Sequence, residues 1–255
     1  MRVDYDNIAP NYDERYAMDE SPGILRVLLD TVRKRVDPVV LEVGCGTGHW
    51  LEPLSRFSKS ILGLEPSSGM LRQARRKRVP ASLIGGRAEE LPFRDEGMDF
   101  VFVVNALHHF ADPGRFIREA HRILQHGGTL ALIGGDPRSP RNSWYGYRYF
   151  EGSLEADLAR FPRWDSLRTW LSGAGFVALE SREIDRVLDP RHGREVLHDP
   201  FLRKGSSSTL AMISQDAYAR GLESIREDVD NAESQGLDLL FETELTILEF
   251  SGVKT

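Results

Sequence analysis

An acidic residue and three glycines stand together where a short apolar run ends. The run is Val39–Val43, it contains Glu42, and Gly44, Gly46 and Gly48 follow it at alternate positions. Glycine lets the backbone turn sharply, and it lets a ligand touch the main chain where a Cβ would collide. An apolar run without polar alternation predicts a strand buried on both faces. We expect the helix that follows to point its free N–H groups at a bound ligand.

The spacing of these residues discriminates between ligands. The dinucleotide fingerprint G-x-G-x-x-G requires a third glycine at position 49, where this chain has His49. An acid at Glu42 suits a cationic amine better than a pyrophosphate. The pattern E-x-G-x-G-x-G therefore favours S-adenosylmethionine (SAM), which carries an ammonium and a sulfonium, and it resembles the class I SAM-dependent methyltransferases. A dehydrogenase is disfavoured by His49, and a flexible loop without a ligand stays open as the alternative.

A second acid follows the next predicted strand, Ser60–Leu64. Glu65 lies roughly 20 residues past the first glycine, where an acid accepts both ribose hydroxyls in nucleotide-binding α/β folds. Two carboxylate oxygens suit a cis-diol because each hydroxyl can donate to one of them. We therefore predict that Glu65 binds the ribose, and that Ser67 caps a helix whose Met70 faces inward.

A third loop, residues 86–93, reads G-R-A-E-E-L-P-F and is similar to the family's adenine-binding G-D-A-E-x-L-P-F. The resemblance implies that the backbone N–H of Ala88 binds the adenine. The departure is Arg87 where the family has aspartate, and an arginine cannot accept a hydrogen bond from the adenine amino group. That hydrogen bond is expected either from Glu89 or not at all.

The fourth predicted strand, Met98–Val104, leads into the segment Asn105-Ala106-Leu107-His108-His109. Ligands of open α/β sheets lie beyond the carboxyl ends of the strands, and the resemblance places Asn105 near the methionyl part of SAM. His108, His109 and Asp136 are the candidates for a general base, named as a set. Two adjacent histidines also suggest a metal, but no further Cys or His cluster completes a set of ligands, so we predict no metal.

The N-terminal segment Y-D-x-x-A-x-x-Y-D-x-x-R resembles the part of small-molecule methyltransferases that folds over SAM. The resemblance implies that its two tyrosines and its arginine close the pocket, with the arginine paired to the methionyl carboxylate or solvated. The full set of residues expected to bind the cofactor is Tyr5, Tyr12, Arg15, Glu42, Gly44, Cys45, Gly46, Glu65, Pro66, Met70, Arg87, Ala88, Glu89, Asn105 and Ala106.

Composition limits the classes of function. The chain has 255 residues, a net charge of −6 and a single cysteine, Cys45. An acidic chain argues against a nucleic-acid partner, and one cysteine excludes an intrachain disulfide. Cys45 is interpreted as a small residue that fits the loop. We find neither a signal peptide nor an apolar run of about 20 residues that could cross a bilayer, and therefore expect a cytoplasmic protein.

The order of the segments predicts an α/β protein with a Rossmann-like, doubly wound, seven-stranded sheet. The sheet is expected to be mostly parallel with an antiparallel last strand, in the order 3-2-1-4-5-7-6, with helical embellishments over the carboxyl edge of its strands. We expect one SAM-binding domain over 1–255, with an N-terminal cap at 1–20, an aromatic lid or insertion at 136–165 and a helical insertion at 188–238. The last of these is expected to cover the active-site mouth or to mediate self-association, which leaves a homo-oligomer open.

Together these patterns identify the chain as similar to the small-molecule methyltransferases of methyltransferase type 11, the ubiquinone–menaquinone methyltransferase-like family. The resemblance implies in-line displacement of a methyl group from SAM to a small-molecule acceptor, with S-adenosylhomocysteine as product. A general base is needed only if the nucleophile must lose a proton. The alternatives are a protein or RNA methyltransferase and a non-catalytic, SAM-binding regulatory protein.

Overall fold

The computed structural model describes residues 3–17 and 21–255. The chain divides into two compact units. Unit 1 consists of Met1–Glu20, Pro137–Phe161 and Arg186–Thr246, and unit 2 consists of Ser21–Asp136, Pro162–Asp185 and Ile247–Thr255. The three segments of unit 1 fall close to the cap and the two insertions expected from the sequence. The single domain itself stays a prediction.

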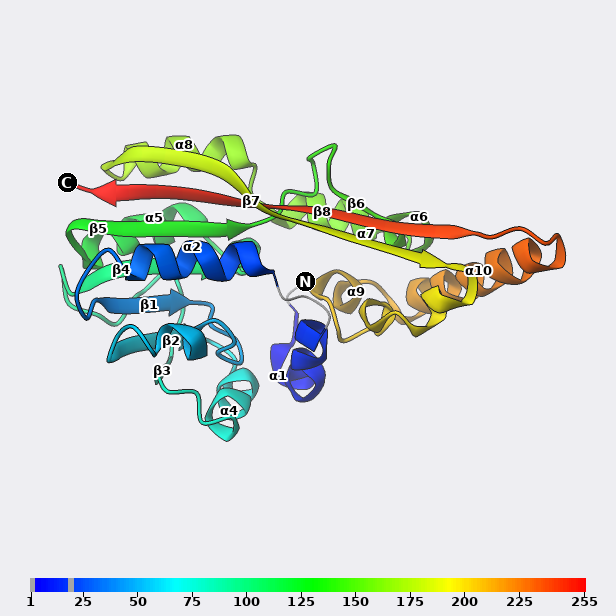
Figure 1. Cartoon of the computed structure of the whole chain (residues 1–255), viewed down its shortest axis with the longest axis horizontal. Helices are drawn as coiled ribbons and strands as arrows, with labels where there is room; N and C mark the ends of the chain where they lie inside the picture. The colour runs from blue at the N-terminus through cyan, green and yellow to red at the C-terminus, as the bar shows by residue number, and fades with distance from the viewer. Residues whose placement is uncertain (1–2, 18–20) are drawn as a thin grey trace. The chain divides into compact units, whose positions relative to one another are not determined.

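Unit 2 contains most of the sheet (Figure 1). Strands β1, β2, β3, β4 and β5 pair in parallel, and β8 pairs antiparallel to β5. The strand order is β3-β2-β1-β4-β5-β8-β6, with β7 also paired to β8. The strands are β1 (Val39–Val43), β2 (Ser60–Glu65), β3 (Ser82–Gly85), β4 (Met98–Val104), β5 (Leu124–Gly134), β6 (Ser143–Trp144), β7 (Phe176–His192) and β8 (Leu240–Lys254). The predicted Rossmann-like sheet and its antiparallel last strand are confirmed, and β6 is an eighth strand that the sequence did not indicate.

The helices of unit 2 cover both faces of the sheet, as continuous apolar strands require. Side chains along one strand point alternately into two cores on opposite faces of the sheet. In β1, Val40 lies in one core, and Leu41 and Val43 lie in the other. Helices α2 (Pro22–Val32), α3 (Leu51–Leu54) and α4 (Ser68–Arg76) pack in the first core, and α5 (Pro113–Ile123) and α8 (Trp164–Gly173) pack in the second. The side chains of Phe100 and Phe102 stack in the first core with ring centroids 5.3 Å apart. Both cores together fix the carboxyl ends of β1, β2, β4 and β5 at one edge.

Two predictions about local structure in unit 2 need correction. The helix after the glycine loop was expected to aim its N-terminal N–H groups at a ligand, but α3 is a single turn of four residues. The sequence Ser21-Pro22 also predicts a helix with Ser21 as N-cap and Pro22 in the first turn, yet the Ser21 side chain makes no capping hydrogen bond. The N–H of Gly23 instead donates to Asp185 Oδ2 at 2.8 Å, and a Cβ on Gly23 would lie 1.9 Å from the Ile184 carbonyl oxygen. The start of α2 is therefore fixed by close packing against β7.

The strands at the chain's C-terminal end are longer than expected. The sequence predicts the sixth and seventh strands over 177–184 and 241–250, but β7 has 17 residues and β8 has 15. Residues 248–253 of β8 pair with β5 in unit 2, and Thr243 and Glu244 pair with β6 in unit 1. Part of the insertion that we expected to be helical is therefore strand, because β7 continues to His192.

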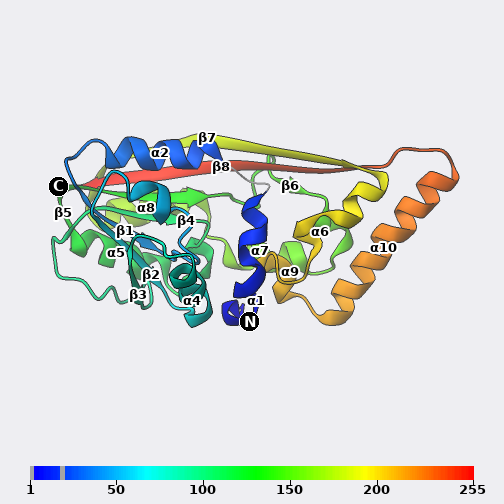
Figure 2. The same cartoon turned by 60° about the horizontal axis from the view of Figure 1, so that its bottom comes forward.

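Unit 1 is built from short elements around one long helix, α10 (Figure 2). Its core holds Phe150, Val196, Leu210, Ile225 and Phe241. The predicted helix at 216–229 is confirmed within α10. The helices of unit 1 are α1 (Tyr5–Ile8), η1 (Ala9–Ala17), α6 (Gly146–Tyr149), α7 (Ser153–Arg160), η3 (Gly193–His198), η4 (Pro200–Leu202), α9 (Ser208–Met212) and α10 (Gln215–Ser234).

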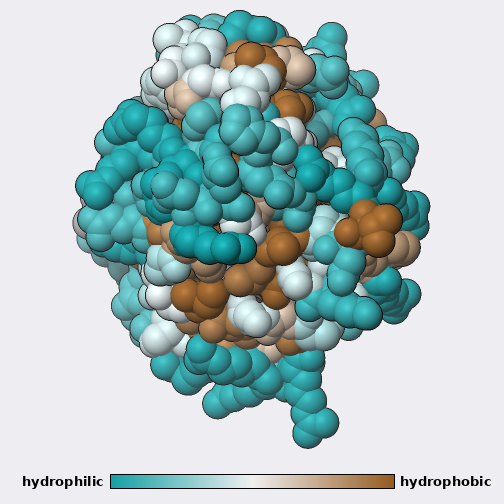
Figure 3. Space-filling view, turned by 90° about the vertical axis from the view of Figure 1, so that its left-hand side faces the viewer, coloured by the Kyte–Doolittle hydropathy of each residue, from teal (hydrophilic) through white to brown (hydrophobic). Residues whose placement is uncertain are grey.

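The surface is mostly hydrophilic on the side where the C-terminus lies, with smaller groups of hydrophobic side chains between (Figure 3). In unit 2, the large hydrophobic side chains that stay exposed include Val36, Phe57 and Val177. Among the helices described, none combines the length and the apolar character that crossing a membrane demands.

Candidate functional site

The glycine loop lies at the carboxyl end of β1, and its backbone conformation explains its residue types. Gly44, Gly46 and Gly48 all have positive φ angles, of 79°, 52° and 78°, which L side chains rarely adopt. A Cβ on Gly44 would lie 2.6 Å from the Cβ of Ala106, directly after β4. A Cβ on Gly48 would lie 3.0 Å from Val79 Cγ2. The glycines therefore let the loop pack closely against Ala106, after β4, and against Val79.

Glu65 connects this loop to the next helix. Its Oε2 accepts a hydrogen bond from Gly46 N at 3.1 Å, and its Oε1 accepts one from Ser67 N at 2.8 Å. The predicted cap of α4 is confirmed, because Ser67 Oγ accepts from Met70 N at 3.1 Å. The carboxylate of Glu65 is thus fixed at the tip of β2. The role of Glu65 at a ribose stays a prediction.

Glu42 is the most unusual group in unit 2. Its side chain is 1% exposed, and Oε2 is buried without a hydrogen-bond partner in the described part of the chain. Burial raises the pKa of this carboxyl well above its ordinary value, and the negative charge of Glu65 raises it further. A buried carboxylate is costly unless it is paired. The position therefore fits a ligand that brings a positive charge, such as the ammonium of SAM.

The candidate bases lie at the same edge of the sheet, at the ends of β4 and β5. His108 and His109 belong to the short helix η2 (Leu107–His109), with ring centroids 4.0 Å apart. Asp136 follows β5 and is 9% exposed. Asn105, which precedes η2, has a φ of 49° and donates its N–H to the Ile133 carbonyl at 2.9 Å. Asparagine tolerates this left-handed conformation better than most residues, so the turn after β4 is tight enough to hold η2 close to β5.

No group of three or more metal-ligating side chains occurs among residues 3–17 and 21–255. The sequence Asp112-Pro113 predicts a helix start with Asp112 as N-cap, and this is confirmed, because Asp112 Oδ1 accepts from Arg115 N at 2.8 Å and caps α5.

In the loop at residues 86–93, which contains Arg87, the Glu89 carboxylate binds backbone N–H groups of the protein itself. Arg87 Nε lies 3.6 Å from Glu89 Oε2, and Glu89 Oε1 accepts from Ala111 N at 2.5 Å and from Asp112 N at 3.4 Å. Partial burial acts to raise the pKa of Glu89, but these backbone N–H groups and Arg87 outweigh it and lower the pKa. Glu89 therefore ties this loop to the start of α5. Its use as an acceptor for adenine stays a prediction.

Two residues of α5 also hold this loop, and sequence reasoning gave them no role. Glu119 Oε2 accepts from Leu91 N at 3.0 Å. Arg122 donates to the carbonyl oxygens of Leu91 and Phe93 at 3.0 and 2.8 Å. The Arg122 hydrogen bond lowers the pKa of Glu119, since it stabilises the ionised form. The sequence signal was the E-x-x-R spacing, which places both side chains on one helix face.

The remaining predicted contacts are distributed over both units. In unit 2, Cys45, Met70 and Ala88 are buried and Pro66 is exposed. Burial raises the pKa of the Cys45 thiol, and Glu42 and Glu65 raise it further, which agrees with Cys45 as a packing residue. The tyrosines Tyr5 and Tyr12 belong to unit 1, with their rings edge to face at 6.1 Å. The side chain of Arg15 lies outside the described part of the structure.

A doubly wound sheet with a glycine loop after β1 and acids at the ends of β1 and β2 defines a nucleotide-binding α/β fold. Residues 41–132 match a model described as a methyltransferase domain. The demethylmenaquinone methyltransferase of Renibacterium salmoninarum is 30% identical over 214 residues, which cover 74% of this chain and 88% of that protein. The chain belongs to the class I SAM-dependent methyltransferases.

Solved structures show the same fold. A candidate methyltransferase from an antibiotic biosynthesis pathway of Anabaena variabilis superposes with a TM-score of 0.71 at 23% identity, covering 90% of this chain and 96% of that one. The phosphoethanolamine N-methyltransferase 2 of Haemonchus contortus, solved with S-adenosyl-L-methionine, gives a TM-score of 0.54 at 17% identity. It covers 90% of this chain and 52% of that one.

Proposed function

We propose that unit 2 binds SAM at the glycine loop and that the protein transfers the methyl group to a small-molecule acceptor, releasing S-adenosylhomocysteine. The observation that carries the proposal is the buried, unpartnered Oε2 of Glu42. A nucleotide phosphate would be repelled there, whereas an ammonium would pair with the carboxylate and remove the cost of burying it.

The protein's part in the reaction follows from the geometry of unit 2. When bound, SAM supplies a methyl group on a positively charged sulfur that leaves as a neutral thioether. Gly44 and Gly46 leave main chain accessible, Glu65 holds the sugar, and Glu42 holds the ammonium. Such groups align a reacting centre and exclude water, which are the main requirements of in-line displacement.

The proton balance depends on the acceptor. A hydroxyl must lose its proton before or as its oxygen bonds to the methyl carbon, and an ammonium must lose one before its nitrogen has a lone pair with which to attack. His108, His109 and Asp136 stand at the ends of β4 and β5, where such a base is required. The relative from Renibacterium is named for methylating demethylmenaquinone, which supports a small, ring-containing acceptor for this chain too.

The test begins with isothermal titration of the protein with SAM and with NAD. We expect SAM to bind and NAD not to bind, and the reverse result would make the site that of a dehydrogenase. The protein is then incubated with methyl-labelled SAM and a cell extract, and small molecules are separated from protein and RNA. Label in the small-molecule fraction supports the proposal. Label in a macromolecule, or SAM binding without transfer, would overturn the proposed acceptor or the proposed catalysis, respectively.

A further inference from the structure

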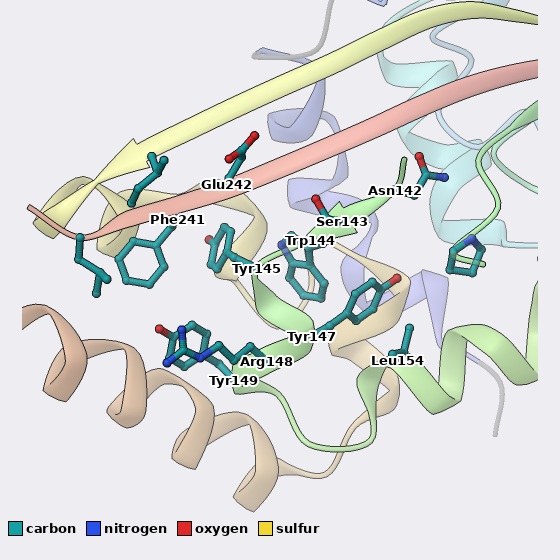
Figure 4. Close-up of a pocket in the computed structure, with 13 residues that line it drawn as sticks. Asn142, Ser143, Trp144, Tyr145, Tyr147, Arg148, Tyr149, Leu154, Phe241 and Glu242 are labelled. Atoms are coloured by element: carbon teal, nitrogen blue, oxygen red, sulfur yellow. The ribbon is translucent and has the colours of Figure 1, made fainter. Parts of the chain in front are cut away.

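Unit 1 contains a pocket that the methyl-transfer proposal does not use. Its volume is about 410 Å³, within the roughly 300–1,000 Å³ of sites for small ligands. The lining residues come from β6 and the segment around it, from α6 and α7, and from the start of β8, and all of them belong to unit 1 (Figure 4). Five of the lining residues are aromatic: Trp144, Tyr145, Tyr147, Tyr149 and Phe241.

The three tyrosines offer their rings to this pocket, because their hydroxyl groups are committed elsewhere. Tyr145 donates to Asp199 Oδ2 at 2.6 Å, and Tyr147 and Tyr149 each donate to a carboxylate at 2.7 Å. Burial raises the pKa of all three phenols, and the hydrogen bonds to the carboxylates raise it further, to about 12 for Tyr149. The phenols therefore stay protonated. Each ring is held at one end by its bond to the main chain and at the other by the hydrogen bond of its hydroxyl group.

The rings are also fixed against one another. Trp144 meets Tyr147 edge to face at 5.2 Å, and Tyr145 meets Phe241 edge to face at 5.4 Å. Rings held in this way leave their remaining faces and edges for a further ring, which prefers offset or edge-to-face contact. Because little side-chain freedom is left to lose, a flat ligand would bind at low entropic cost.

Two charged residues line the pocket, Arg148 and Glu242. The guanidinium carbon of Arg148 lies 5.4 Å from the centre of the Tyr149 ring, and the Arg148 side chain is 75% exposed. The nearest carboxylate, Asp228, is 3.6 Å away, beyond the roughly 2.7–2.9 Å of a charge-assisted hydrogen bond, and it already accepts from Tyr149. Glu242 extends from β8 on the side opposite to Phe241 (Figure 4), as residues at successive positions of a strand do.

We propose that this pocket binds a planar aromatic carboxylate, with the ring between the aromatic side chains and the carboxylate paired to Arg148. The guanidinium presents parallel donors that match the two oxygens of a carboxylate. All the lining residues belong to unit 1, so binding of the carboxylate can be measured whether or not SAM transfer is confirmed.

The experiment uses isothermal titration of the full chain with three probes: 2-naphthoate, the neutral 2-naphthalenemethanol and the non-aromatic cyclohexanecarboxylate. We expect 2-naphthoate to bind and each of the other two to bind about 10-fold more weakly, or worse, since each lacks one of the two recognition elements. Absence of 2-naphthoate binding up to about 1 mM, or equal affinity for all three probes, would overturn the proposal.

Arg148→Gln localises the binding. It is expected to remove the preference for 2-naphthoate over 2-naphthalenemethanol, whereas Arg148→Lys keeps part of it. The matched control is Arg220→Gln, which removes another exposed arginine of unit 1, paired to Glu151 at 3.0 Å, and is expected to bind as the unchanged protein does. Circular dichroism of each variant confirms its folding. The pocket would not be the site if Arg148→Gln and Arg220→Gln lost the preference for 2-naphthoate equally. The same would follow if Arg148→Gln kept that preference in full.

Discussion

Two buried acids, one in each unit, differ in their hydrogen-bond partners. In unit 1, Asp157 is 3% exposed, and both of its carboxylate oxygens accept hydrogen bonds. The donors are the hydroxyls of Tyr147 and Thr209 and two nitrogens of the Arg160 guanidinium. In unit 2, Glu42 is 1% exposed and one of its oxygens has no partner within the described residues. Pairing of this kind offsets the cost of burying the acid in unit 1. Under the proposed function, the missing partner of Glu42 Oε2 in unit 2 is the ammonium of the ligand.

The first way to test this contrast is Asp157→Asn, with the largest expected effect. Arg160 is 11% exposed, so the substitution leaves a buried guanidinium facing a neutral amide. We expect the free energy of unfolding to fall by about 3–5 kcal/mol, measured by urea denaturation. Glu151→Gln, at a carboxylate that is 82% exposed, serves as control and should change it by less than about 0.5 kcal/mol. If both substitutions changed the free energy of unfolding equally, the hydrogen bonds of Asp157 would contribute no more to stability than an exposed carboxylate does.

In unit 2 the corresponding prediction concerns binding. Glu65→Ala removes an acceptor for the ribose hydroxyls and releases Gly46 N–H and Ser67 N–H. SAM affinity should fall by about 1–3 kcal/mol, measured by titration calorimetry. Glu90→Ala, at a side chain that is 76% exposed, should leave the affinity unchanged. If Glu65→Ala binds SAM as well as the Glu90 variant does, Glu65 does not belong to the site.

A third prediction uses pH to separate paired from unpaired acids. The pKa of Glu42 is raised in the folded protein, so between its ordinary and its raised value the folded state binds more protons than the unfolded state. The contribution of Glu42 to stability is therefore fully present below the ordinary value and falls as pH rises through that window. Glu42→Gln imitates the protonated form and should abolish this fall.

The measurement is the thermal midpoint without ligand. At neutral pH, Glu42→Gln is expected to melt roughly 2–4 °C higher than the unchanged protein, with the difference shrinking toward pH 4 and with weaker SAM binding. If Glu42→Gln instead lowered the thermal midpoint at neutral pH, Glu42 would not be a buried acid whose Oε2 lacks a partner in the ligand-free protein.

The smallest expected effect compares one helix cap in each unit. Ser67 caps α4 and Ser214 caps α10, and each hydroxyl oxygen accepts an N–H at 3.1 Å. Each serine-to-alanine change should cost about 1 kcal/mol of unfolding free energy, measured in urea. Only Ser67→Ala is expected to weaken SAM binding as well, because Ser67 N–H also holds Glu65. Weaker binding in Ser214→Ala would remove this distinction between the units.

The sequence predicted best those features that depend only on residues close together in the chain. Apolar runs predicted β1, β2, β4 and β5, and Asp112 and Ser67 were correctly assigned as caps because capping acts over three residues. Ser21 was assigned wrongly as a cap, since the partner of Gly23 is Asp185, 162 residues away.

Contacts between distant residues account for what was missed. The hydroxyls of Tyr145, Tyr147 and Tyr149 reach carboxylates 54, 10 and 79 residues away, and no local pattern encodes such pairings. The aromatic run at 136–165 was recognised as unusual, but its choice between lid and packing element could not be settled from composition. Glu89 was likewise interpreted as a ligand contact, although its nearest partners are the N–H groups of Ala111 and Asp112.

The strand β8 supplies side chains to two hydrophobic cores, Phe241 to that of unit 1 and Phe250 to one of those in unit 2. Because both cores include side chains of this one strand, neither can close before β8 has been synthesised. A premature stop codon upstream of Leu240 would therefore leave both units incomplete.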